Sequence, residues 1–140
     1  MGMSFDFDPQ TECYWNEQHN YIGYSYGSLL AAHTANYKAK YTGCWIDNLV
    51  LIASPISSDF LTSVENEPWI GNVHIINLTQ YGDRLYAGLN DVAFLYAVPW
   101  LAYQQGQKGG VGHFYYAADD STGRKRRQAL ANQIYNLGLR

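Results

Sequence analysis

The sequence predicts an α/β protein: a mostly parallel sheet of about four strands with flanking helices, in one domain that spans residues 1–140. Apolar runs of strand length alternate along the chain with stretches of helical periodicity, which is typical of parallel strands joined by helices. The run Leu49–Ala53 is unbroken, as in strands that are covered on both faces. A 47% share of hydrophobic residues against 15% charged ones supplies a core for a chain of 140 residues.

The first third of the chain predicts an irregular start, a short strand and a helix. Residues 1–18 show no clear hydrophobic period, so we expect irregular structure there, with the FDFD stretch as a candidate short strand. The stretch NYIGYS predicts a strand that enters a turn at Ser25. Apolar and aromatic residues then recur at spacings of three and four from Leu29 to Tyr41, and Gly43 ends this predicted helix.

The middle of the chain predicts two more strands with a short helix between them. The stretch IDNLVLIASP predicts a buried strand that ends at Ser54 and Pro55. The stretch SSDFLTSVENEPW predicts a helix that is capped by Ser57 or Ser58. The β-branched stretch NVHIINLTQYGD predicts a strand that runs into a polar loop.

Two helices and a glycine-rich loop complete the predicted fold. The stretch NDVAFLYAVPWLAYQQ predicts a helix that is interrupted near Pro99. The stretch GQKGGVGHFYYAADDSTG predicts a loop with a short aromatic strand. The C-terminal stretch predicts an amphipathic helix, with Ala129, Ile134 and Leu137 facing inward and the arginines facing outward.

Charge and cysteine content limit the functions to consider. A net charge of −3 provides no general basic field, so we expect no nucleic-acid partner. The basic run Arg124–Arg127 predicts the solvated first turns of the last helix, and contact with phosphate or anionic lipid is the alternative. Cys13 and Cys44 have no metal-ligand spacing, so we expect no metal, and a disulfide between them is left open.

The sequence predicts neither a cofactor nor a membrane segment. The stretch GQKGGVG lacks the Lys-Ser/Thr ending of a phosphate-binding loop. Residues 1–10 carry acidic residues and no apolar segment of the signal-peptide kind. No run approaches the roughly 20 apolar residues of a membrane span. We therefore expect a soluble protein, and its compartment is left open.

The motif GYSYG, Gly23–Gly27, is the strongest candidate for chemistry. It places a serine between a predicted strand and a predicted helix, the frame in which a tight turn exposes a nucleophile. Ester hydrolysis needs such a serine, a histidine that takes its proton and a carboxylate that orients the histidine. We expect Ser25 to be this nucleophile and the amide of Tyr26 to face an oxyanion. A purely structural turn is the alternative.

His113 is the expected base among the four histidines. It lies in a glycine-dense loop before the last helix, and glycines permit the backbone to carry an imidazole over a neighbouring strand end. We interpret His33 as a helix-surface residue and His74 as part of a strand. His19 has no loop signal that would bring it over the serine.

Asp83 is the expected acid. It follows the end of a predicted strand, where sites form in open parallel sheets. The chain order of Ser25, Asp83 and His113 is also the order used by one class of serine hydrolases. Asp59, which follows the preceding strand, is the alternative acid, and we interpret Asp91 as a helix cap.

On these residues the chain resembles the α/β-hydrolases of the lipase and esterase kind. The resemblance covers residues 20–140, corresponds to the C-terminal half of the family pattern, and rests on GYSYG, LVLIASP, LTQYGD and GHFYY. The chain is similar, more narrowly, to the hydrolase-type C-terminal regions of Rhs-repeat and related polymorphic toxins of bacteria, through YIGYSYGSLLAAHTA, GDRLYAG and the last helix. This resemblance implies an effector lipase or phospholipase, delivered outside the cell as part of a larger toxin, with an immunity protein as its partner.

These observations predict a serine hydrolase that cleaves carboxylic esters, with a lipid as the expected substrate. Tyr24, Phe114 and Tyr115 are the expected lining for an acyl group, and core packing is the alternative for each. A thioesterase or an acyltransferase would use the same triad. Few residues precede the serine strand, so we expect that strand at an uncovered sheet edge where a second copy could pair. A non-catalytic scaffold that assembles through this edge is the second hypothesis.

Overall fold

The computed structural model describes residues 17–140. The FDFD stretch, Cys13 and nearly all of the predicted irregular start lie outside the described residues. The described chain forms three strands, four α-helices and two short 3-10 segments: β1 (Asn20–Tyr24), α1 (Tyr26–Tyr41), β2 (Ile46–Ile52), α2 (Ser58–Glu65), β3 (Ile70–Ile76), η1 (Thr79–Tyr81), α3 (Asp91–Gln105), η2 (Gly112–Ala117) and α4 (Ser121–Asn136).

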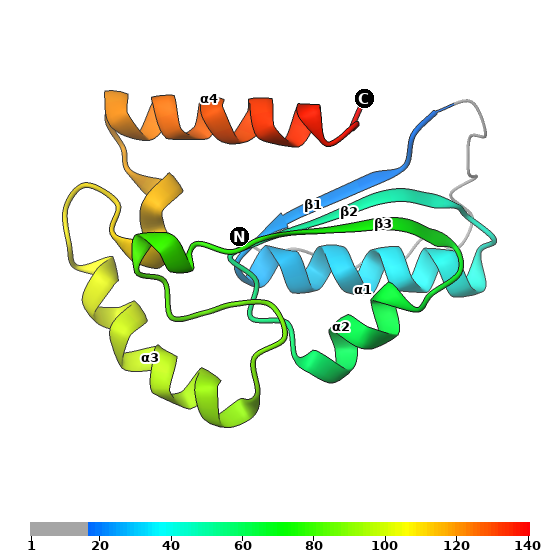
Figure 1. Ribbon diagram of the computed structural model, residues 1–140, viewed down its shortest axis with the longest axis horizontal. Helices are drawn as coiled ribbons and strands as arrows, with labels where there is room; N and C mark the ends of the chain where they lie inside the picture. The colour runs from blue at the N-terminus through cyan, green and yellow to red at the C-terminus, as the bar shows by residue number, and fades with distance from the viewer. Residues whose placement is uncertain (1–16) are drawn as a thin grey trace.

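The three strands form one parallel sheet in the order β1-β2-β3. Gly23 is in register with Leu51, and Leu51 is in register with Ile75. All three strands point toward the same end of the molecule (Figure 1), so the segments that follow them meet there. The predicted α/β class with a parallel sheet is confirmed.

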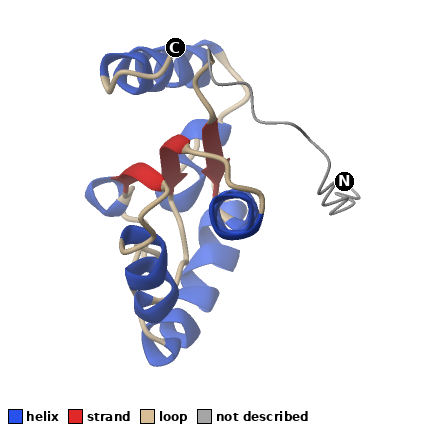
Figure 2. Cartoon of the chain, turned by 90° about the vertical axis from the view of Figure 1, so that its right-hand side faces the viewer, coloured by secondary structure: helices blue, strands red, loops and turns tan. Residues whose placement is uncertain are grey.

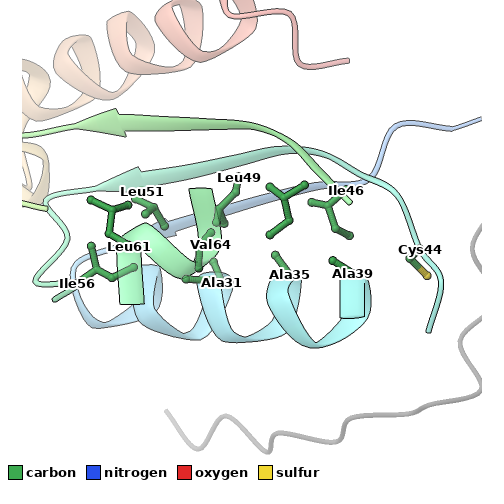
Figure 3. Close-up of a cluster of buried hydrophobic side chains, with 12 residues drawn as sticks. Ala31, Ala35, Ala39, Cys44, Ile46, Leu49, Leu51, Ile56, Leu61 and Val64 are labelled. Atoms are coloured by element: carbon green, nitrogen blue, oxygen red, sulfur yellow. The ribbon is translucent and has the colours of Figure 1, made fainter. Parts of the chain in front are cut away.

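Helices cover both faces of this sheet. In Figure 1, α1 and α2 lie on one side of the strands and α4 lies on the other. In Figure 2, the C-terminal helix is separated by the strands from most of the other helices. Leu49 of β2 packs with Ala35 of α1 and Val64 of α2 in the first core cluster (Figure 3). Val50, on the opposite face, packs in a second cluster with Leu130 of α4. Burial on both faces explains why the β2 sequence is apolar without alternation.

The sheet of the described residues has three strands rather than about four. The aromatic strand predicted around His113 is wrong, because these residues form the 3-10 segment η2. Side chains of α4 bind backbone carbonyls there: Arg126 Nη1 donates to Tyr115 O at 2.9 Å, and Arg127 Nη1 donates to Tyr116 O at 2.8 Å. The arginines therefore supply the hydrogen bonds that a neighbouring strand would otherwise donate to these carbonyls.

The last two helices differ in part from the prediction. Helix α3 continues through Pro99, whose ring removes one backbone hydrogen bond at a position that faces solvent. In α4, Ile134 packs inward as predicted, together with Leu130. Ala129 and Leu137, also predicted to face inward, are exposed.

Helices α2 and α3 begin with ordinary side-chain caps. Ser57 caps α2, as predicted, by accepting a hydrogen bond from the backbone N–H of Phe60. The cap of α3 is Asn90, and Asp91 is the first residue of the helix rather than its cap. Within residues 17–140, no helix combines the length and the apolar character needed to cross a membrane.

Candidate active site

Ser25 occupies a sharp turn between the last residue of β1 and the first residue of α1. Its backbone N–H still donates to Ile52 O at 2.8 Å, as a sheet residue would, while α1 begins at the next residue. The backbone angles that this requires are φ 55° and ψ −124°. Such a conformation costs a non-glycine residue about 1–3 kcal/mol and is concentrated at functional sites. The hydroxyl of the buried Ser28 hydrogen-bonds to the Ser25 carbonyl and helps to hold the turn.

The two glycines of the GYSYG motif have different roles. A Cβ atom at Gly23 would lie 2.3 Å from the carbonyl oxygen of Gly27 and 2.4 Å from the Cα of Ser28, so β1 and α1 pack backbone to backbone here. A Cβ atom at Gly27 would meet no atom within 4 Å. Backbone crowding therefore explains the glycine at position 23 but not the glycine at position 27.

Ser25, His113 and Asp83 form one continuous chain of hydrogen bonds. Ser25 Oγ lies 2.6 Å from His113 Nε2, and His113 Nδ1 lies 2.9 Å from Asp83 Oδ2. A carboxylate can only accept, so Nδ1 carries the proton and the neutral imidazole presents Nε2 as the acceptor for the serine hydroxyl. The second oxygen of Asp83 accepts from the backbone N–H of Leu85 at 2.9 Å, which fixes the carboxylate. Asp83 and His113 are both buried, so bulk water does not compete for these bonds.

A buried glutamine on α3 joins the loop of the acid to the loop of the base. Gln104 Nε2 donates to Gly82 O at 2.8 Å, and Gln104 Oε1 accepts from the backbone N–H of His113 at 3.0 Å. Gly112 has a φ of +57°, and a Cβ atom there would lie 2.3 Å from this amide, so a larger residue would strain the backbone and displace the glutamine. Gln104 was not predicted as a site residue, because a glutamine near the end of an apolar helix carries no signal of its role until the two loops are placed.

Tyr24 also contacts His113, through both its hydroxyl and its ring. Its hydroxyl donates to the His113 carbonyl, and its ring stacks on the imidazole with 5.6 Å between the ring centres. Burial, followed by the nearby charge of Asp83 and the Tyr116 hydroxyl, raises the pKa of Tyr24 to about 12. Tyr24 therefore stays protonated and remains a hydrogen-bond donor at neutral pH.

The two other predicted lining residues lie in different surroundings. Phe114 meets the edge of the His113 ring, with 5.2 Å between ring centres, and is half-buried beside the site. Tyr115 stacks on Tyr81 at 3.7 Å and lies under the guanidinium of Arg126 at 4.0 Å. Tyr115 therefore packs in the second core cluster, and the expectation that it lines the site finds no support in this packing.

The basic run of α4 holds the loop of His113. Arg126 Nη1 donates to the carbonyls of Gly109 and Gly110 at 2.9 and 3.1 Å, in addition to its bond to η2. Arg127 Nη1 also donates to Ala118 O at 2.9 Å. The prediction that this run is solvated helix surface is therefore incomplete. Two of its four residues, Arg126 and Arg127, bind backbone carbonyls of the loop that carries His113.

The remaining candidates lie away from this triad. His33 is exposed on α1 and stacks on a phenylalanine of α2, and His74 is half-buried in β3 and bonds to Asn48 Oδ1 at 3.0 Å. His19 bonds to the Trp45 carbonyl at 3.2 Å. Asp59, the alternative acid, is exposed in the first turn of α2, and Asp83 occupies the position next to the imidazole.

The N-terminus of α1 presents the backbone N–H of Tyr26 next to Ser25. Tyr26 is the first residue of α1, so its backbone N–H has no partner within the helix and lies at the positive end of the helix dipole. Next to Asp83, a cavity of about 530 Å³ is lined by Arg84, Trp100 and Gln104, among others. In the part of the chain that the structure describes, no group of three or more His, Cys, Asp or Glu residues could hold a metal ion.

No protein-family model, curated protein or solved structure matches this chain.

Proposed function

We propose that this chain is a serine hydrolase that cleaves carboxylic esters through Ser25, His113 and Asp83. The single observation that carries the proposal is the unbroken hydrogen-bond chain from Ser25 Oγ through the imidazole to the Asp83 carboxylate. The serine sits on a strained turn at the N-terminus of a helix, and its two partners are buried. A packing role alone does not require three such groups in this order and geometry.

The reaction would proceed in two halves. Ser25 Oγ attacks the ester carbonyl while His113 Nε2 takes its proton, and Asp83 stabilises the imidazolium that forms. The Tyr26 amide donates to the oxyanion of the tetrahedral intermediate. The C–O bond to the alcohol then breaks, His113 returns the proton to the leaving oxygen, and an acyl-serine remains. A water molecule that gives its proton to His113 attacks this acyl group and releases the acid, and the proton returns to Ser25.

The proposed substrate is a lipid ester. Tyr24 stacks on the imidazole and Phe114 meets it edge to face, and aromatic rings beside the base suit an apolar acyl group. Together with the residues that resemble lipase-type α/β-hydrolases, this supports the proposal of a lipase or phospholipase. The further proposal of a toxin effector with an immunity protein as partner depends on that sequence resemblance alone.

The test compares Ser25→Ala with Ser63→Ala, which removes an exposed hydroxyl from α2. With p-nitrophenyl esters of increasing chain length, Ser25→Ala should lower kcat by a factor on the order of 10⁴ or more, while Ser63→Ala should match the wild type. A fluorophosphonate probe should label the wild type and Ser63→Ala but not Ser25→Ala. Equal turnover by all three proteins would refute the proposal.

A non-catalytic scaffold is the second candidate. In the sheet of the described residues, β1 has a partner strand on one side only, and Ile22 in its middle is 50% exposed. An uncovered edge of this kind favours pairing with another strand. Absence of fluorophosphonate labelling in the wild type, together with a dimer on a sizing column, would support the scaffold over the hydrolase.

A further inference from the structure

Helix α3 exposes an unusually apolar surface at the end of the molecule that carries the triad. Figure 1 places α3 at the end toward which the strands point. Only Ala97 and Gln104 of its residues are buried. Its exposed side chains include a group that we call the α3 surface: Val92, Leu95, Tyr96, Val98, Trp100 and Tyr103. Leu95 and Tyr96 are 70% and 76% exposed. A helix that is apolar all round is normally covered, so this surface indicates a binding partner.

The charges that border the α3 surface are mainly positive. From residue 92 to residue 118 the chain contains no aspartate or glutamate, although its net charge is −3. Arg84 lies over the Trp100 ring at 4.5 Å, and Lys108 follows the end of the helix. The acidic residue of α3 is Asp91 at its first position, and the neighbouring Asp83 is buried against His113. An apolar surface bordered by cations complements an anionic lipid headgroup layer.

The residue types of the α3 surface suit the boundary between lipid and water. Tyr96, Trp100 and Tyr103 combine an apolar ring with a polar group, which is why such residues are concentrated at membrane interfaces. A helix of 15 residues is about 22 Å long, shorter than the hydrocarbon core of a bilayer. The helix can therefore lie in the interface but cannot span the membrane.

We propose that the α3 surface docks on lipid bilayers that contain anionic phospholipid. Docking through α3 would face the triad-bearing end of the sheet toward the membrane. Trp100 and Tyr103 of α3 line the same cavity as Asp83, so the α3 surface extends to the side of the triad that holds the acid. Docking itself does not need Ser25. The inference rests on the proposed function only where it connects docking to a lipid ester as the substrate.

The experiment measures co-sedimentation with vesicles of phosphatidylcholine alone and of phosphatidylcholine with phosphatidylglycerol. We expect the wild type to bind the anionic vesicles more tightly, and added salt to weaken binding. Leu95→Glu and Tyr96→Glu should each lower the partition coefficient about tenfold or more, because apolar contact is lost and a negative charge meets the headgroups. The matched control is Tyr41→Glu, at a position that is 74% exposed at the C-terminal end of α1, and it should bind as the wild type does.

Ser25→Ala separates this inference from the proposed function. If Ser25→Ala binds vesicles like the wild type, docking is supported whether or not the chain hydrolyses esters. A wild type that hydrolyses soluble esters but does not bind either vesicle would overturn docking and leave the hydrolase proposal standing. Docking is also overturned if Leu95→Glu and Tyr41→Glu have equal effects, or if Leu95→Glu converts a dimer that does not bind vesicles into a monomer.

Discussion

Adding one methyl group at Gly23 should destabilise the fold and disable the site together. The Cβ atom of Gly23→Ala would lie 2.3 and 2.4 Å from backbone atoms of Gly27 and Ser28, so β1 and α1 must separate by about 1 Å to restore ordinary contact. Overpacking of this kind costs about 1–3 kcal/mol, and we expect about 3 kcal/mol because both neighbours are backbone. With an unfolding entropy of about 2.1 cal/mol/K per residue, this lowers Tm by about 10 °C.

The same displacement acts on the nucleophile two residues later. Ser25 Oγ lies 2.6 Å from His113 Nε2, and a shift of about 1 Å in such a contact costs about a hundredfold in rate. Thermal unfolding and ester turnover test both effects. Gly27→Ala is the matched control: its Cβ meets open space within a helix, where alanine is favoured over glycine by up to about 1 kcal/mol. If Gly23→Ala has the same Tm and ester turnover as the wild type, or if Gly27→Ala is equally destabilised, close packing of β1 on α1 does not decide stability at this position.

Three further changes test the surroundings of the imidazole. Gln104→Ala should speed hydrogen exchange of the His113 amide about tenfold and lower kcat more than it raises KM, because the clamp between the two loops is lost. Asp83→Asn should lower kcat by about 10⁴, since the imidazole loses its orienting acceptor, whereas Asp59→Asn should have no effect. Burial raises the pKa of Tyr24 to about 12, while the unfolded chain titrates near 10. Its contribution to stability is therefore complete below pH 10 and is lost as pH rises toward 12, and Tyr24→Phe should weaken that loss in urea unfolding.

Each of these tests has a contrary outcome. Unchanged exchange of the His113 amide in Gln104→Ala would show that the two loops hold each other without the glutamine. Equal loss of turnover in Asp59→Asn and Asp83→Asn would contradict the assignment of the acid. Comparing Tyr24→Phe with the wild type separates the effect of Tyr24 from that of the other tyrosines. If the free energy of unfolding falls equally in both proteins above pH 10, the raised pKa of Tyr24 is contradicted.

Local patterns in the chain were enough to predict several parts of this structure. The apolar run of β2, the turn at Ser25 and the cap at Ser57 depend on neighbours within a few residues, so their residue types report them directly. The approach of His113 and Asp83 to Ser25 was predicted from their position after strand ends and glycines, since parallel strands present those ends at one edge of the sheet.

Other features depend on residues that only the folded chain brings together. Gln104 can clamp two loops because the end of α3 lies within hydrogen-bonding distance of both, and Arg126 can order the glycine-rich loop because α4 contacts η2. The requirement for glycine at position 23 but not at position 27 is set by the close approach of β1 and α1. The exposure of α3 likewise could not be predicted, because an apolar helix has the same sequence pattern whether a core, a partner or a lipid surface covers it. These features arise from contacts between distant segments, and sequence patterns report such contacts only weakly.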